Sequence, residues 1–183
     1  MKLIVIIAII VVLVALWIIR VQRNLVSSDE NCCNAMSQIG VQQQSRWDAL
    51  TALAELTKSY SEHEYNALKE IIAMRQGVNG NSSAEQADAQ EQLLTKAMRS
   101  INMTVERYPD LKANQTYIKT MDSVNLYESQ VRTSRMIYND SVTIYNRLIR
   151  QFPTSFVASM LHFDKRDYLQ ENKETASMPS MKI

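Results

Sequence analysis

The chain has 183 residues, of which 20 are Lys or Arg and 19 are Asp or Glu, so its formal net charge is +1. This balance lacks the concentrated basic charge that nucleic-acid binding needs, and no nucleic-acid partner is expected. With three Gly and three Pro residues, the chain has few helix breakers. This composition favours long helices and nearly excludes Gly-rich phosphate loops.

A run of apolar residues at the amino terminus predicts a transmembrane helix. Residues 3–19 carry no charge, and fourteen of these seventeen residues are Leu, Ile or Val. As a helix the run is about 26 Å long, slightly short of a ~30 Å hydrocarbon core, and Lys2 and Arg20 at its edges can snorkel toward the headgroups. Trp17 stands where an interfacial aromatic residue belongs. Because no small-residue cleavage site follows, we expect residues 1–23 to be an uncleaved single-pass anchor in contact with membrane lipid.

Two helical segments are expected directly after the anchor. Residues 24–76 contain no proline and a single glycine, Gly40, and their apolar positions mostly recur at steps of three, four or seven. This spacing predicts one helix over 24–76. Residues 77–83 hold the other two glycines and form the clearest loop. Ser83, three residues before Gln86, is a candidate N-cap for a second helix over 83–107.

The most regular apolar pattern lies further along the chain. Between Tyr117 and Phe152 the pattern advances by three or four residues throughout, which predicts a long helix over 112–151 with left-handed, coiled-coil-like packing. A short helix over 154–161 is then expected to fold back onto the bundle. The residues expected to make that contact are Phe156, Val157, Met160 and Leu161.

These segments together predict an all-α protein. A single transmembrane helix is followed by a long antiparallel helical bundle over 24–168. Residues 169–183 are polar and contain Pro179, so they are expected to be a disordered tail.

Several polar residues fall on or beside the apolar stripes of the predicted bundle. A charged group is costly to bury without a partner, so these residues should pair with one another. We favour a buried polar layer that fixes helix register. A ligand-binding or partner-binding site and plain solvent exposure are the alternatives. The residues are His63, Glu64, Glu128, Arg132, Arg135, Asn139 and Asn146.

The sequence offers little for catalysis or for metal and cofactor binding. A di-metal bundle needs two Glu-x-x-His motifs, but neither His63 nor His162 has a Glu three residues before it. Cys32 and Cys33 are the only cysteines and are adjacent, so they supply neither a disulfide framework nor a metal site. They are interpreted as ordinary thiols, with an intermolecular disulfide or lipidation as alternatives. No catalytic residue, metal ligand or cofactor is predicted, and an enzyme is not expected.

Several motifs resemble the LemA family of bacterial membrane-anchored helical proteins, over about 24–168. The first are Ala-Met-Ser-Gln-Ile-Gly-Val-Gln at 35–42 and Arg-Trp-Asp at 46–48. The most specific is Glu-Arg-Tyr-Pro-Asp-Leu-Lys-Ala-Asn at 106–114, and the pair Tyr-Asn then occurs at 138–139 and again at 145–146. Thr51-Ala52 replaces the Pro-Asn pair usual in the family, which should let the first helix run straighter.

The resemblance implies a single-pass protein of the bacterial inner membrane with no catalytic residues to transfer. It also suggests a membrane metallopeptidase as a partner. The anchor and the long helices lead us to expect docking of other membrane proteins or of a second copy. We expect a non-enzymatic scaffold, adaptor or self-assembling module. The alternative is an envelope-stress or small-ligand sensor that uses Glu128 and Arg135. Arg20 and Arg23 outnumber Lys2 among the flanking side chains, which weakly favours a cytoplasmic bundle.

Overall fold

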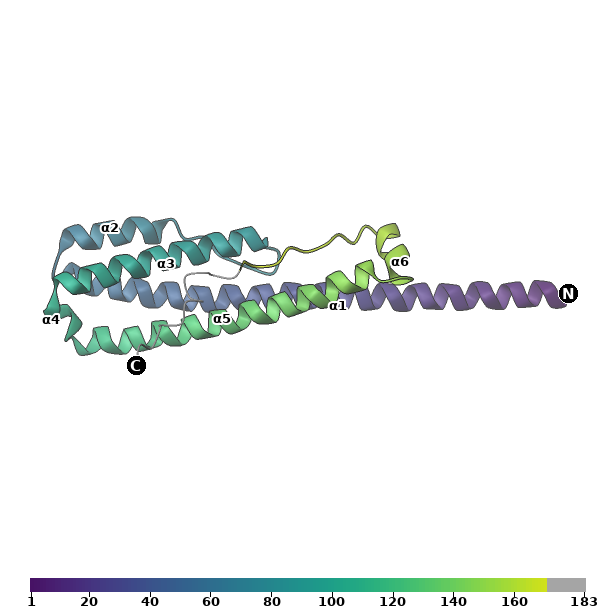
Figure 1. The fold of residues 1–183 in the computed structure, drawn as a ribbon, viewed down its shortest axis with the longest axis horizontal. Helices are drawn as coiled ribbons and strands as arrows, with labels where there is room; N and C mark the ends of the chain where they lie inside the picture. The colour runs from purple at the N-terminus through teal and green to yellow at the C-terminus, as the bar shows by residue number, and fades with distance from the viewer. Residues whose placement is uncertain (171–183) are drawn as a thin grey trace, which may run out of the picture.

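The computed structural model describes residues 1–170, so residues 171–183 of the predicted tail lie outside the described part. Within residues 1–170, six helices form an elongated rod along α1 (Figure 1). No strand occurs among residues 1–170, and the predicted all-α fold is confirmed. The helices are α1 (Lys2–Lys58), α2 (Glu62–Ala73), α3 (Ala84–Arg107), α4 (Pro109–Lys112), α5 (Gln115–Arg150) and α6 (Thr154–Met160).

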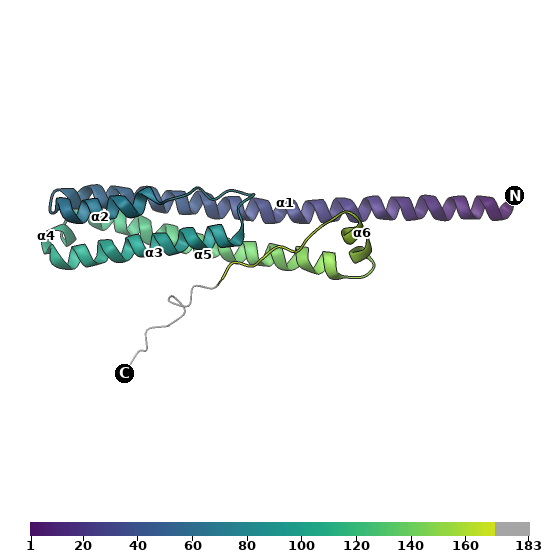
Figure 2. The same cartoon turned by 90° about the horizontal axis from the view of Figure 1, so that it is seen from above.

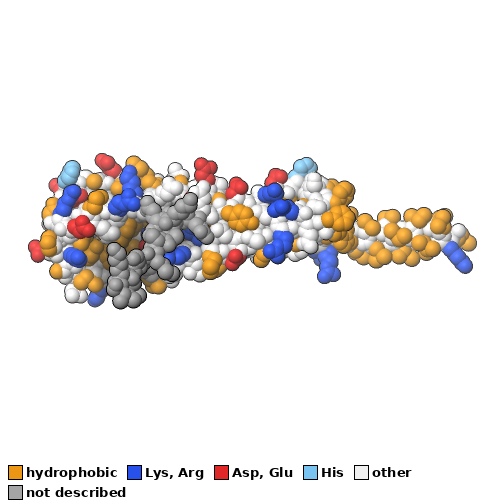
Figure 3. Space-filling view, in the orientation of Figure 1, with side chains coloured by type: hydrophobic (Ala, Val, Ile, Leu, Met, Phe, Trp, Pro, Cys, Tyr) orange, Lys and Arg blue, Asp and Glu red, His pale blue; other side chains and the backbone are white. Residues whose placement is uncertain are grey.

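Helix α1 joins the apolar amino terminus to the bundle without a break. Its 57 residues correspond to about 86 Å at 1.5 Å per residue. The first buried side chain is that of Val21, and the part of α1 before it projects from the bundle as a rod covered by hydrophobic side chains (Figure 3). Within residues 1–170, α1 is the helix that is long and apolar enough to cross a membrane.

The continuous helix predicted over 24–76 is wrong, because the structure divides it into two. Helix α1 ends at Lys58, and α2 begins at Glu62 and runs back along it (Figure 1). Ser61 has an extended backbone, and its side chain accepts a hydrogen bond of 3.3 Å from the Glu64 amide. Ser-x-x-Glu is a sequence signature of a helix start, so the break has a local cause.

The extra reversal changes the order of directions in the bundle. Helix α3 runs in the same direction as α1, whereas α5 runs against both (Figures 1 and 2). Ser83 and Gln86 form the capping box that starts α3. Before it, the loop over 74–83 passes so close to α1 that a Cβ atom at Gly40 would overlap the Val78 carbonyl oxygen. This glycine therefore permits the loop to cross the helix.

Two hydrophobic cores follow one another along the rod. The near core, beside the exposed apolar part of α1, includes Leu25, Met36 and Tyr145. The far core, at the closed end, includes Trp47, Leu94 and Val124. Between these clusters along α1, side chains of Gln43 and Arg46 are buried although they are polar, which marks a boundary between the two cores.

The carboxyl-terminal part differs from its prediction in two ways. Of the four residues expected to bury α6, Val157 is buried, but Phe156, Met160 and Leu161 are exposed. A seven-residue helix has only one narrow face toward the bundle, and Ala158 shares it with Val157. Residues 162–170 then run back along the bundle without helical structure (Figure 1). The tail predicted to be disordered from residue 169 is therefore wrong at its start, because Leu169 is 3% exposed and bonds to Asn139. We call residues 162–170 the strap.

Candidate functional site

Arg46 of α1 lies at the centre of a buried ion cluster that joins three helices. Its guanidinium donates a hydrogen bond of 2.6 Å to Glu91 of α3 and one of 3.2 Å to Glu128 of α5. The Gln43 amide donates to the second oxygen of Glu91 at 3.3 Å. The Arg46 side chain is only 3% exposed, so these interactions act in a medium that screens charge weakly.

The cluster opens to solvent on the side of α5. The Glu128 side chain is 33% exposed and lies 3.5 Å from Arg132, one turn further along the same helix. Two guanidinium groups thus balance two carboxylates. Arg46 Nε and Gln43 Oε1 have no hydrogen-bond partner among the described residues. The geometry therefore holds three helices in register, although not every polar atom in it is satisfied.

A second constellation binds the strap to α5 through two asparagines. The Asn146 side chain donates to the Arg166 carbonyl at 2.9 Å and accepts from the Arg166 amide at 3.0 Å. Asn139 makes the same pair of bonds with Leu169, at 3.1 and 2.9 Å. Each asparagine therefore satisfies both backbone groups of one strap residue, as a neighbouring β-strand would.

The tyrosine that precedes each asparagine adds a further bond to the strap backbone. The Tyr145 hydroxyl donates to the Asp164 carbonyl at 2.8 Å, and the Tyr138 hydroxyl donates to the Asp167 carbonyl at 3.1 Å. Seven residues of helix advance about 10.5 Å, and three residues of extended chain advance about 10 Å. The one-heptad repeat of Tyr-Asn therefore matches the strap's backbone repeat, and it contacts backbone groups rather than strap side chains.

Side chains hold the strap at two further points. Arg166 donates to Asp29 of α1 at 2.6 Å and to the Cys33 sulfur at 3.1 Å. The hydrogen bond with Asp29 raises the pKa of Arg166 above its usual value. Near the end of the described chain, Arg135 donates to Asp88 and to the Gln170 carbonyl, both at 2.6 Å. These contacts join the strap to α1, α3 and α5.

The seven residues predicted to form one polar layer are distributed along the rod. Glu128 and Arg132 belong to the ion cluster, whereas Arg135 pairs with Asp88. Glu64 lies near the closed end, where it pairs with Arg107 at 2.6 Å. Asn139 and Asn146 bind the strap instead. The prediction that places His63 with them is wrong, because its side chain is exposed.

Sequence reasoning missed Arg46 and Glu91, which form the strongest part of the cluster. Arg46 belongs to the Arg-Trp-Asp motif at 46–48, and Glu91 lies three residues before the apolar Leu94. Both positions therefore carried a usable signal, namely a charge on a helix face that must be buried. The contribution of Asp29 and Asp88 to strap binding had no comparable signal, because it depends on a segment without periodic pattern.

A cysteine thiol and a tyrosine hydroxyl are buried beside the strap, and their burial predicts that the bundle loses stability at alkaline pH. Burial is the main cause that raises the pKa of Cys32 from 9.0 to about 11 and that of Tyr145 from 10.0 to about 12. Above about pH 9 the unfolded chain releases these protons before the folded chain does, so the free energy of unfolding falls as the pH rises. Chemical unfolding between pH 8 and about 11 should show this decline.

Cys32→Ala is the matched variant for the alkaline decline. The variant should lose the part of the pH dependence that begins near the ordinary thiol pKa of 9.0, while the tyrosine part remains. A parent protein whose unfolding free energy stays constant over this range would contradict the prediction.

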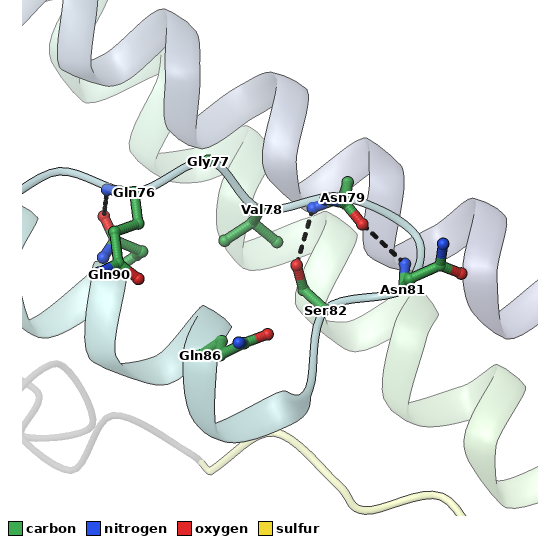
Figure 4. Close-up of a pocket in the computed structure, with 8 residues that line it drawn as sticks. All are labelled: Gln76, Gly77, Val78, Asn79, Asn81, Ser82, Gln86 and Gln90. Carbon is green, nitrogen blue, oxygen red and sulfur yellow. Dashed lines mark hydrogen bonds between the residues drawn. The ribbon is translucent and has the colours of Figure 1, made fainter.

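Two pockets on the surface of residues 1–170 are small and shallow, and neither resembles a catalytic site. The first has a volume of about 240 Å³ and lies between the loop over 74–83 and α3, where it is lined by amides and small polar groups (Figure 4). The second, of about 430 Å³, lies between α1 and α5. No group of three His, Cys, Asp or Glu residues within the described chain could hold a metal ion.

The fold and the polar clusters define an elongated helical bundle continuous with a candidate membrane helix. The LemA family profile matches residues 35–183, and the chain belongs to the LemA family. This finding confirms the resemblance seen in the sequence.

Named relatives match over part of their length. Protein LemA of Metamycoplasma hominis is 25% identical over 142 residues, which are 76% of this chain and 65% of that protein. Magnetosome proteins MamQ 1 and MamQ 2 of Paramagnetospirillum magneticum are each 31% identical over 75 residues, 41% of this chain and 28% of theirs. The chain therefore spans less than two thirds of the length of each relative.

Proposed function

We propose that this protein is a non-enzymatic, membrane-tethered adaptor whose bundle docks another protein or a second copy of itself. The observation that carries this proposal is a stripe of large apolar side chains exposed on α5. The stripe consists of Ile118, Leu126, Met136, Ile137 and Ile144, which are 42–61% exposed. We call these five residues the α5 stripe.

The geometry of the α5 stripe suits a partner helix. At about 100° per residue the five side chains fall within an arc of roughly 100°, and they cover about 39 Å of helix. Asp122 and Asp140 lie between them on the same arc and are exposed, and exposed Lys119 lies at its edge. Two carboxylates against one ammonium leave the arc acidic, so a partner with Lys or Arg beside its apolar face would complement this surface. Large apolar side chains repeated along one face of a helix are the pattern by which a helix presents anchors to a partner.

The proposed attachment to the membrane rests on helix α1. In the proposal its apolar end anchors the protein, single-pass, in the bacterial inner membrane, and the remaining part carries the bundle into the cytoplasm. Arg20 and Arg23 next to the bundle support this orientation by the positive-inside bias. Because the anchor and the bundle share one helix, the α5 stripe would stand at a set distance from the membrane. A membrane metallopeptidase is one candidate partner, and a second copy is another.

Site-specific photocrosslinking in native membranes tests the adaptor proposal. A photoreactive amino acid at Leu126 or Ile144 should form one discrete crosslinked product, since both side chains lie in the α5 stripe. The same residue at Asn66, exposed on α2, is the matched control position. Co-expression of two tagged versions of the chain separates self-association from binding of another protein. Identical diffuse products at stripe and control positions would overturn the proposal.

A further inference from the structure

The connection between α5 and the strap exposes large apolar side chains that the bundle does not use. Phe152 is 84% exposed, Phe156 70% and Met160 51%. Val157 and Ala158 of the same segment are buried in the near core. We call residues 152–161, which include α6, the α6 cap. Its inward side chains are packed, and its large outward side chains are apolar, with the small polar Ser159 exposed beside them.

The α6 cap lies beside the place where the exposed apolar part of α1 ends. Val157 and Ala158 share the near core with Val21 and Leu25, and Ile18 packs against this core. Both views place α6 alongside α1 at that level (Figures 1 and 2). A patch of hydrophobic side chains is visible there at the end of the bundle, next to the rod (Figure 3). In a protein whose apolar rod is inserted, this level is the surface of the membrane.

Basic residues lie around the position where the exposed apolar part of α1 ends. Arg20 and Arg23 follow the apolar run of α1, and Arg147 and Arg150 lie in the last turn of α5. All four side chains are exposed. Aromatic side chains next to arginines are the composition of segments that lie in the interface of anionic membranes. The exposed acidic residue closest in sequence to the α6 cap is Asp164, against four exposed arginines at this end of the bundle.

We propose that the α6 cap is a second membrane contact, which rests on the proposed tethering by α1. Phe152, Phe156 and Met160 enter the boundary between headgroups and acyl chains of the membrane that holds α1, and the four arginines contact anionic headgroups. The two contacts lie on different helices, so together they restrict the tilt of the rod relative to the membrane. The occupant of this apolar surface is lipid, because the surface continues directly into the membrane-spanning part of α1.

Quenching of tryptophan by brominated acyl chains measures this contact in the full chain reconstituted into vesicles. Native Trp17 and Trp47 allow single-tryptophan variants, and Trp47 Nε1 makes no hydrogen bond within residues 1–170, so Trp47→Phe removes none. In that background three probes are compared. They are native Trp17, Phe156→Trp in the α6 cap and Leu126→Trp on the distant part of α5, the last two with Trp17→Phe.

The expected result is strong quenching of Trp17, about twofold or greater quenching at position 156 and no quenching at position 126, since interfacial segments sit only 5–10 Å deep. Met160→Trp is the second cap probe, should the variant at 156 be misfolded by circular dichroism. Quenching at 156 should be weaker in zwitterionic phosphatidylcholine than in vesicles that contain phosphatidylglycerol. It should also fall in Arg147→Gln/Arg150→Gln.

The two proposals fail in distinguishable ways. If Trp17 is quenched while positions 156 and 160 are as unquenched as position 126, the α6 cap does not contact lipid, and the tether is unaffected. If Trp17 itself is unquenched, the tether is overturned and the cap contact with it. Equal quenching in the two lipid compositions would overturn the role of the arginines.

Discussion

Replacing Arg46 with alanine is expected to lower the free energy of unfolding by about 3–5 kcal/mol, the usual cost of removing one partner from a buried ion pair. The substitution leaves Glu91 buried and negatively charged, and it removes the group that links α1 to both α3 and α5. It also leaves a void where a long side chain was packed. Urea unfolding followed by Trp47 fluorescence measures the loss, because Trp47 is adjacent and 2% exposed.

Arg132→Ala is the matched control for this prediction. Arg132 also pairs with Glu128, but its side chain is 66% exposed, so its removal should cost less than about 1 kcal/mol. The double variant Arg46→Leu/Glu91→Leu should recover part of the loss, because it removes the orphaned carboxylate together with its partner. Equal destabilisation by Arg46→Ala and Arg132→Ala would show that the ion cluster does not hold the helices together.

The contacts of the ion cluster also bear on the alternative that this protein is a sensor. Glu128 and Arg132 are the members that reach solvent, with side chains 33% and 66% exposed. The partners of Glu128, which are Arg46 and Arg132, are both cations. The polar residues therefore form ion pairs among themselves, which suits a layer that fixes register. A sensor role for Glu128 and Arg135 stays a prediction.

Apolar spacing was sufficient to predict the helical class and much of the core. On α5, Val124, Val131, Tyr138, Val142 and Tyr145 are buried, as the repeat indicates. The pattern failed at Phe152, because a periodic stripe carries no information about where the bundle surface ends. It failed also between Lys58 and Glu62, where apolar spacing continued while the Ser-x-x-Glu signal for a new helix was overlooked.

The partners of polar residues were less predictable than the core. A charged residue on an apolar stripe indicates burial, but its partner depends on how three helices are rotated against one another. Glu128 therefore pairs with Arg46, which is 82 residues away in sequence, in addition to the neighbouring Arg132. The partners of the two asparagines were equally hard to predict. The one-heptad repeat of the asparagines was visible, yet the strap they bind has no helical or strand period that would identify it.

Replacing both Asn139 and Asn146 with alanine is expected to release the strap without unfolding the bundle. Each asparagine makes two hydrogen bonds with a strap backbone, so each substitution removes about 2 kcal/mol of strap binding. The binding free energy lost at both asparagines exceeds what the two remaining hydrogen bonds from the Tyr138 and Tyr145 hydroxyls contribute. The helices should persist, because release of the strap withdraws Leu169 and Phe163 from the near core but leaves the apolar contacts among α1, α3, α5 and α6 in place.

Hydrogen exchange of the strap amides measures this release. The Arg166 amide should exchange about 30-fold faster in Asn146→Ala, which is the rate equivalent of about 2 kcal/mol. The Leu169 amide should respond in the same way to Asn139→Ala, and amides within α5 should keep their protection. Asn125→Ala, at an exposed position of the same helix, is the matched control and should change neither amide.

Unchanged exchange at Arg166 and Leu169 in the double variant would mean that other contacts hold the strap. Arg166 with Asp29 and Cys33, and Gln170 with Asp88, would then be the contacts to remove.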